Sequence, residues 1–318
     1  MEHVVECEIY NQVLGQKLMI KDYITETFAT DGNPKGNYFL LKLDGLGEVQ
    51  ADRHTMDAHG DGSIYINSNL AERELQIELV ILADESKNME ELRREISKIV
   101  NPKAGLLELR YKEEQKTYRI NVASDHVPTF TTEDYLGKKR QRVTLTLVAS
   151  DPFWYAENSE VHYLSNWQPN LDWELEFPLT ENKDLGIELE TFLKDGLVTL
   201  ENDGDEFTGA IFLLSASGDV LNPEIIRIMP DGSSTQKMKL LTSMKAGDRI
   251  RISTISGQKR VEKWSDDRQI WLNIFNTLTM DSTFIQLDVG ENYLRSTAAT
   301  HSDQLEIKVQ YESRYVGV

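Results

Sequence analysis

RVTLTLVASDPFWY, residues 142–155, is the stretch of sequence that decides the fold. From Arg142 to Val148, apolar and polar residues alternate, and the β-branched Val and Thr favour extended backbone. Asp151-Pro152 closes the run, because proline cannot donate a backbone hydrogen bond and restricts the residue before it. The stretch therefore predicts a long strand with one apolar face, followed by a domain boundary.

The same period of two recurs along the whole chain. Turn residues separate the apolar runs, as at Asp31-Gly32-Asn33-Pro34, Asp61-Gly62, Asn202-Asp203-Gly204-Asp205 and Asp231-Gly232. We expect further strands near residues 4–9, 38–43, 75–80, 185–189, 209–214, 224–228, 249–253, 284–287 and 305–311. This pattern predicts a mainly β protein, of the β-rich α+β class.

One segment, residues 88–100, has helical spacing instead. Its apolar residues fall at positions 89, 92, 96, 99 and 100. Asn88 is suited to cap the first turn, and Glu91 lies three residues on, as in a capping box. Asn101-Pro102 ends the segment. We expect one amphipathic helix laid across a sheet in the first half.

The length of 318 residues favours two domains. Periodicity is lost from residue 158 to residue 178, so we interpret 158–180 as a connector and place the domains at 1–160 and 161–318. Residues 1–155 carry 19 − 26 = −7 formal charges, and residues 156–318 carry 15 − 27 = −12. Neither half is basic.

Composition excludes several classes of protein. The chain has 53 acidic and 34 basic residues, a net charge of −19, whereas specific nucleic-acid binding needs clustered Lys and Arg. The first residues are acidic, and the longest aliphatic runs, such as Leu79 to Ala83, are far shorter than the ~20 residues of a membrane helix. We expect a soluble chain made in the cytoplasm, without membrane insertion. The single cysteine, Cys7, excludes an intrachain disulfide and a multi-cysteine zinc site.

No motif assigns a catalytic or cofactor site. Phosphate loops, nucleophile elbows and His-Glu-x-x-His are absent, and Gly45-Leu46-Gly47 lacks the third glycine of a dinucleotide fingerprint. Cys7, with His3 four residues earlier, is interpreted as a small buried hydrophobe and not as a nucleophile. We expect no enzymatic activity and no cofactor.

Two segments have the residue types of a cation site. The run from Asp52 to Asp61 holds His54 and His59 with three aspartates, but matches no known ligand spacing. Residues 202–206, NDGDE, could bind calcium but lack the repeated ligands and terminal Glu of an EF-hand loop. A polar loop or strand edge and a plain acidic turn are the favoured interpretations, so we assign no metal site.

Five tryptophans lie at or after the expected boundary: Trp154, Trp167, Trp173, Trp264 and Trp271. Aromatic rings on a β-sandwich can stack on sugars, so binding of a sugar or a partner is one interpretation. Packing in the core and between domains is the other, and it is favoured because tryptophan buries a large area.

Local signatures occur in a distinctive order from one end of the chain to the other. In the first half they are Asn11-Gln12-Val13-Leu14-Gly15, Gly45-Leu46-Gly47, Gly60-Asp61-Gly62-Ser63-Ile64-Tyr65, Arg73 before a strand, Leu92-Arg93-Arg94, Val100-Asn101-Pro102-Lys103-Ala104-Gly105 and Asp151-Pro152-Phe153. In the second half they are Asn202-Asp203-Gly204-Asp205, Thr208-Gly209, Asn222-Pro223-Glu224-Ile225, Lys245-Ala246-Gly247-Asp248, Val289-Gly290-Glu291-Asn292-Tyr293 and Arg314-Tyr315-Val316-Gly317-Val318. Through these motifs the chain resembles the distal tail proteins of bacteriophages with long, non-contractile tails. Each motif is weak alone, and Glu291 stands where the family has Asp, so the resemblance rests on their order over nearly all of the chain.

The resemblance implies an N-terminal β domain that assembles as a homo-hexameric ring and a C-terminal galectin-like or carbohydrate-module-like β-sandwich outside it. It implies a structural hub at the virion tail tip of a phage or prophage particle. Such a hub joins the tail tube protein to the tail tip or baseplate, where tail-associated lysins, fibres or receptor-binding proteins attach, and DNA passes through its lumen. The galectin sugar motif is absent, and Trp264-Ser265-Asp266-Asp267-Arg268 departs from it. The alternative is a soluble carbohydrate-binding module, an accessory to a cell-wall glycan hydrolase.

Overall fold

The computed structural model describes residues 5–22, 36–113, 116–131, 139–164, 167–169, 190–192, 197–229 and 234–318. The chain divides into two compact units, Met1–Glu157 with Arg314–Val318, and Asn158–Ser313. The expected turns at 31–34 and 231–232, the expected strand at 185–189, His3 and Trp173 lie outside the described residues. No helix in the described part of the chain is both long enough and apolar enough to cross a membrane.

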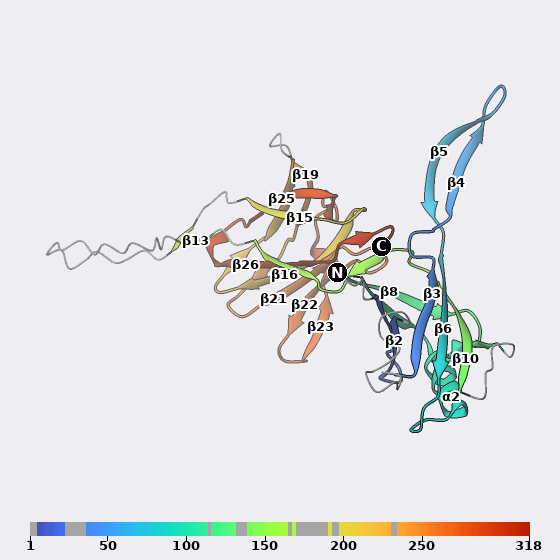
Figure 1. Ribbon diagram of the computed structural model, residues 1–318. Coiled ribbons are helices and arrows are strands. Elements are labelled where there is room, and N and C mark those ends of the chain that lie inside the picture. The colour runs from blue at the N-terminus through green and yellow to red at the C-terminus, as the bar shows by residue number, and fades with distance from the viewer. Residues whose placement is uncertain are drawn as a thin grey trace, which may run out of the picture. The chain divides into compact units, whose positions relative to one another are not determined.

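The first unit is built on a sheet that closes on itself (Figure 1). Its strands are β1 (Val5–Asn11), β2 (Gln16–Asp22), β3 (Tyr38–Asp44), β6 (Arg73–Leu82), β7 (Leu107–Glu113), β8 (Lys116–Ser124), β9 (Thr129–Phe130), β10 (Arg140–Ala149), β11 (Trp154–Ala156) and β27 (Arg314–Tyr315). Their order is β27-β11-β8-β7-β1-β2-β3-β6-β10-β9, and β8 also pairs with β10. This second pairing closes β8, β7, β1, β2, β3, β6 and β10 into a barrel, in which the β2–β3 and β8–β10 contacts are two residue pairs long.

Alternation along β6 and β10 fills the barrel core. The register pairs Leu79 with Val143, Ile77 with Leu145 and Leu75 with Leu147. These inward side chains are buried, because side chains of successive strand residues point to opposite faces. The strand predicted from the alternation at 142–148 is confirmed, and the mainly β fold class with it.

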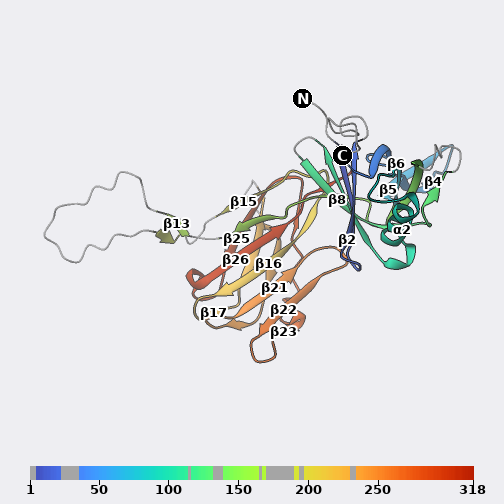
Figure 2. The same cartoon turned by 60° about the horizontal axis from the view of Figure 1, so that its bottom comes forward.

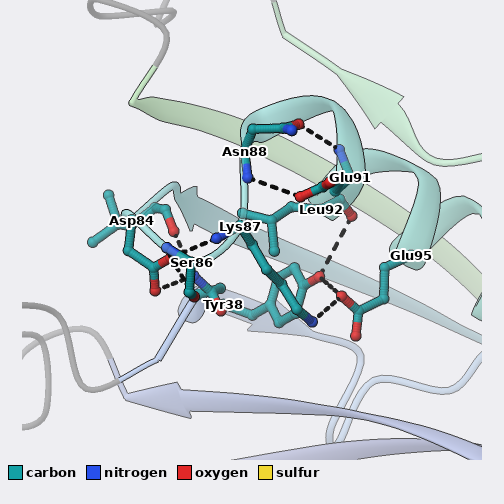
Figure 3. A network of polar contacts seen from close by, with 10 residues as sticks. Tyr38, Asp84, Ser86, Lys87, Asn88, Glu91, Leu92 and Glu95 are labelled. Atoms are coloured by element: carbon teal, nitrogen blue, oxygen red, sulfur yellow. Dashed lines mark hydrogen bonds and ion pairs between the residues drawn. The ribbon is translucent and has the colours of Figure 1, made fainter.

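The predicted helix is confirmed as α2 (Met89–Ile99), which packs Met89, Leu92, Ile96 and Ile99 into the barrel core. Its capping box forms as the sequence predicts: the Glu91 backbone N–H donates to Asn88 Oδ1 at 3.0 Å, and the Asn88 N–H donates to the Glu91 carboxylate at 3.1 Å (Figure 3). On the next turn the Tyr38 hydroxyl donates to Glu95 at 3.0 Å, and burial together with this carboxylate raises the pKa of Tyr38. The capping box closes the first turn of the helix, and the apolar face together with the Tyr38 contact holds the helix on the barrel.

The second unit is a β-sandwich (Figure 2). One sheet has the order β12-β26-β16-β21-β22-β23, with β24 also on β16, and the other has the order β15-β25-β18-β19. The strands are β12 (Glu160–Tyr163), β15 (Val198–Asn202), β16 (Thr208–Ala216), β18 (Glu224–Ile228), β19 (Ser234–Lys239), β21 (Arg249–Ser253), β22 (Arg260–Ser265), β23 (Ile270–Asn273), β24 (Gln286–Leu287), β25 (Gly290–Thr297) and β26 (Leu305–Tyr311). Both sheets contribute to one core, in which Phe212 of β16 and Leu294 of β25 are fully buried.

Short elements complete the fold. They are the strand pairs β13 (Trp167–Pro169) with β14 (Glu190–Phe192) and β17 (Val220–Leu221) with β20 (Ser243–Met244), and the 3-10 turns η1 (Pro102–Ala104), η2 (Phe275–Thr277) and η3 (Ser302–Gln304). The strand expected at 284–287 is shorter than predicted, since only Gln286–Leu287 pairs with β16.

Residues 314–318 lie in the first unit, although the sequence prediction included them in the second domain. The reason is that this segment pairs with β11 of the first unit. In β27, Arg314 and Tyr315 pair with Tyr155 and Trp154 of β11, and the Tyr315 ring meets the edge of Tyr118 at 5.2 Å between centroids. A contact between residues so far apart in sequence leaves no periodic signal.

Candidate functional site

A two-stranded arm is the most exposed feature of the first unit. It consists of β4 (Ala51–Asp57) and β5 (Ser63–Leu70), which pair with each other alone and run out beyond the ends of β3 and β6 (Figure 1). Every arm residue is exposed except Leu70, which is half-buried. An isolated two-stranded hairpin is marginally stable in water. The arm therefore has the form of an element that is completed by a neighbour.

Apolar side chains occupy both faces of the arm. Cross-strand partners share a face, so Met56 and Ile64 lie on one face, and Tyr65 with its partner Thr55 lies on the other. A bulge between His54 and Thr55 shifts this register. The four large apolar side chains near the tip, Met56, Ile64, Tyr65 and Ile66, are each between 53% and 60% exposed. Clustered exposed apolar groups of this kind mark a contact surface.

Arg73, the first residue of β6, lies fully buried at the root of the arm. Its guanidinium donates to the carbonyls of Pro152 (2.7 Å), Gly45 (2.6 Å) and Leu46 (2.9 Å), and to the carbonyl of Val316. Burial lowers the pKa of Arg73 to about 10, so the group stays charged at neutral pH. One cation thus holds together three segments that are distant in sequence.

Close backbone packing surrounds this arginine. Gly45 has φ +94°, and a Cβ there would lie 2.2 Å from the Glu74 carbonyl oxygen. A Cβ on Gly317 would lie 3.1 Å from the Cα of Gly47. The Trp154 indole N–H donates to the Leu46 carbonyl at 3.1 Å, and its ring centroid lies 6.0 Å from the Arg73 guanidinium carbon. The Gly45-Leu46-Gly47 motif therefore serves a tight turn against the barrel.

An open groove of about 980 Å³ lies beside the same turn. Five carboxylates line it, from Asp44, Glu48, Asp52, Glu72 and Glu74. Lysine and arginine are absent from its lining, although Lys42 pairs with Asp44 at 2.6 Å. The groove gives the root of the arm a strongly negative surface.

Two family models match this chain. The phage tail protein RIFT-related domain matches residues 33–149, which include most of the barrel and the arm, and the siphovirus-type tail component C-terminal domain matches residues 203–315. The chain belongs to the siphovirus-type phage tail components. The resemblance to distal tail proteins is thereby confirmed, and the chain is a distal tail hub component of this kind.

Solved structures share the fold of this tail component. The SPP1 Dit protein, described as a paradigm of the hub adsorption apparatus in phages that infect Gram-positive hosts, is 15% identical, with a TM-score of 0.64 over 97% of this chain and 98% of that one. The phage P2 baseplate in its activated conformation with Ca gives 11% identity and a TM-score of 0.52, over 99% of this chain and 100% of that one. Among curated proteins, none matches the sequence at a significant level.

The candidate cation run of the tail component, Asp52 to Asp61, spans β4 and the tip of the arm. His54 has Asn67 as its cross-strand partner, and the Asn69 side-chain amide lies 3.4 Å from its Nε2. Within the described residues, no group of three or more His, Cys, Asp or Glu side chains converges as a metal site would. The run forms the exposed strand β4 and the turn that follows it.

The acidic turn at 202–206 is closed from within. Asn202 is buried, accepts from the Gly204 N–H at 3.1 Å and donates to the carbonyls of Glu206 (3.0 Å) and Leu287 (3.3 Å). The Asn202 side-chain amide therefore hydrogen-bonds the backbone groups of the turn, as in an Asx turn.

Cys7 is fully buried in β1. Burial first, and the neighbouring Glu8 second, raises the pKa of its thiol to about 12. A thiol that is protonated and inaccessible cannot act as a nucleophile. The interpretation of Cys7 as a buried hydrophobe fits this environment.

Trp154, Trp264 and Trp271 have packing roles. Trp154 is buried in the first unit, and Trp264 and Trp271 form a cross-strand pair on β22 and β23 with ring centroids 5.4 Å apart. Arg249 lies over Trp264 at 5.3 Å and Arg251 over Trp271 at 4.4 Å. Since these guanidinium groups already stack on the indoles, the arrangement favours packing over a platform for sugars.

Proposed function

We propose that this chain assembles as a six-membered ring at the virion tail tip and joins the tail tube protein to the tail-tip or baseplate proteins. The first unit, residues 1–157 with 314–318, forms the ring. The second unit, residues 158–313, supports a tail-associated lysin, a fibre or a receptor-binding protein. The role is structural and not enzymatic, and DNA passes through the lumen. The exposed arm is the observation that carries this proposal.

The arm suits a repeated interface between copies. A ring closes when one head-to-tail contact repeats around an axis, and such a contact needs an element on one copy that completes its neighbour. Met56 and Ile64 on one face and Tyr65 on the other offer apolar surface in two directions. Burying both faces against the next copy would supply the stability that an isolated hairpin lacks.

Charge suits a conduit that DNA passes without binding. Six copies would carry 6 × −19 = −114 formal charges. Negative surface repels phosphate, and the carboxylate groove at the root of the arm concentrates part of this charge. A ring structure with a basic or neutral lumen, and with its acids confined to the outer domain, would contradict this part of the proposal.

The ring is tested by light scattering and negative-stain microscopy of the full chain, alone and with the tail tube protein. We expect ring-shaped hexamers. Ile64→Asp combined with Ile66→Asp should abolish them, because each change places a charge on the apolar arm. Ile270→Asp on β23 is the matched control: Ile270 is 48% exposed in the second unit, and rings should persist.

Two results would count against the ring. One is a wild-type chain that stays monomeric at high concentration with the tube protein present. The other is an arm variant that forms rings as well as the control does. A monomer that also binds cell-wall glycan with micromolar affinity would favour the alternative of a carbohydrate-binding module.

A further inference from the structure

The chain crosses between its two units twice. It leaves the first unit after Glu157 and returns at Arg314. We call residues 314–318 the strap. The strap begins as β27, where the Arg314 guanidinium carbon lies 3.8 Å from the Phe153 ring centroid and 3.7 Å separates Arg314 from Asp151. The returning segment is therefore anchored on the segment that leads out of the first unit.

Beyond β27 the strap reaches the root of the arm. The Val316 carbonyl accepts from Arg73, and Gly317 packs against Gly47 so closely that an added Cβ would lie 3.1 Å from the Gly47 Cα. Val318 packs against the barrel core. Each residue after Tyr315 thus contacts an element that supports the arm.

Arg73 connects these contacts. It donates to Gly45 and Leu46, a few residues before β4, to Pro152 on the outgoing segment and to Val316 on the strap. A buried guanidinium that loses one acceptor must find another or admit water, so removal of the strap disturbs its remaining bonds. Displacement of one segment is in this way transmitted to the other two.

We propose that the strap holds the root of the arm in place, with Arg73 as the positioning residue, so that the segment returning from the second unit sets how well the arm is ordered. A load or a partner on the second unit would then reach the arm through Val316 and Gly317. The proposal needs no ring, because every contact that carries it lies within one chain.

Hydrogen–deuterium exchange on the full chain tests the proposal with Gly317→Val. The added side chain must displace the strap from Gly47. We expect amide exchange at Ala71, whose N–H donates to the Gln50 carbonyl at 2.8 Å at the root of the arm, to rise at least tenfold. Exchange in β1 and β7, which pair along their whole length away from the strap, should not change.

Gly60→Val is the matched control, because Gly60 lies at the tip of the arm and an added Cβ there would meet nothing within 4 Å. This variant should leave exchange at Ala71 unchanged. Arg73→Lys keeps the charge but not the four-way geometry, and it should reproduce a smaller part of the Gly317→Val effect.

Two outcomes would overturn the proposal: unchanged exchange at Ala71 in Gly317→Val, or an equal rise in β1 and β7, which would mean general loss of stability. Light scattering on the same samples separates this result from the ring. Rings that vanish while exchange at Ala71 stays constant would reject the strap alone, and raised exchange at Ala71 in a chain that never forms rings would reject the ring alone.

Discussion

The arm and β6 follow each other along the chain and are both paired strands, yet they bury very different amounts of apolar surface. Ile77 in β6 is fully buried, whereas Ile64 in β5 is 53% exposed. β6 pairs with β3 on one side and with β10 on the other, whereas each arm strand pairs only with the other. Pairing and burial of apolar area therefore both separate the two regions: the barrel strands stabilise themselves, and the arm needs a neighbour.

The same substitution, Ile→Ala, in β6 and in the arm should give the largest difference in the free energy of unfolding. Ile77→Ala should lower the free energy of unfolding by about 2–5 kcal/mol, because it leaves a cavity in the closed barrel. Ile64→Ala should cost less than about 0.5 kcal/mol in the isolated chain, because its side chain is already hydrated. Denaturant titration of the monomer measures both. An equal cost at the two positions would show that the arm is packed in the monomer.

Local chemistry in the sequence predicts the barrel side of this comparison better than the arm. The alternation at 142–148 and the Asn88 and Glu91 capping box each depend on neighbours within a few residues, and both are confirmed. Closure of the barrel depends on the pairing of Leu147 with Ser124, which no local pattern encodes.

The sequence of the arm favours a polar segment or a cation site, because Asp and His residues are more frequent in residues 52–61 than large apolar ones. A weaker signal was present: Thr55-Met56-Asp57 and Ser63-Ile64-Tyr65 flank a glycine-rich turn, as strands of a hairpin do. In the sequence, Arg73 is notable only as one of the motifs of the family resemblance. Its four carbonyl partners come from segments up to 243 residues away, so sequence alone could not reveal its role.

Asn11 offers the next test, at the turn between β1 and β2. It is fully buried, donates to the Ile99 carbonyl at 2.8 Å and accepts from the Leu14 N–H at 2.9 Å. Asn11→Ala should lower the free energy of unfolding by about 1–3 kcal/mol, because the Ile99 carbonyl and the Leu14 N–H lose their hydrogen-bond partner. Asn69→Ala on the arm is the control and should be close to neutral in thermal or denaturant unfolding. A neutral Asn11→Ala would mean that water replaces the lost amide.

Asn88 gives a smaller effect at the start of α2. Asn88→Ala removes the side-chain cap and should lower the free energy of unfolding by about 1 kcal/mol. Asn67→Ala, an equal truncation on the exposed arm, should change it by much less. If circular dichroism and denaturant titration show equal effects, the cap adds nothing beyond the packing of Met89 and Leu92 on the barrel.

Asp84 gives the smallest effect, through pH. Hydrogen bonds from the Ser86 hydroxyl (2.6 Å) and the Lys87 N–H (2.8 Å) lower its pKa to about 2, below the value of about 3.9 in an unfolded chain (Figure 3). A lowered folded-state pKa adds stability above pH ~4, which is lost as the pH falls towards 2. The difference in unfolding free energy between wild type and Asp84→Asn should therefore be constant above pH ~5 and shrink below pH ~4. Asp57→Asn on the arm controls for the loss of one negative charge, and an identical pH profile for both variants would contradict a specific role for the Asp84 bonds.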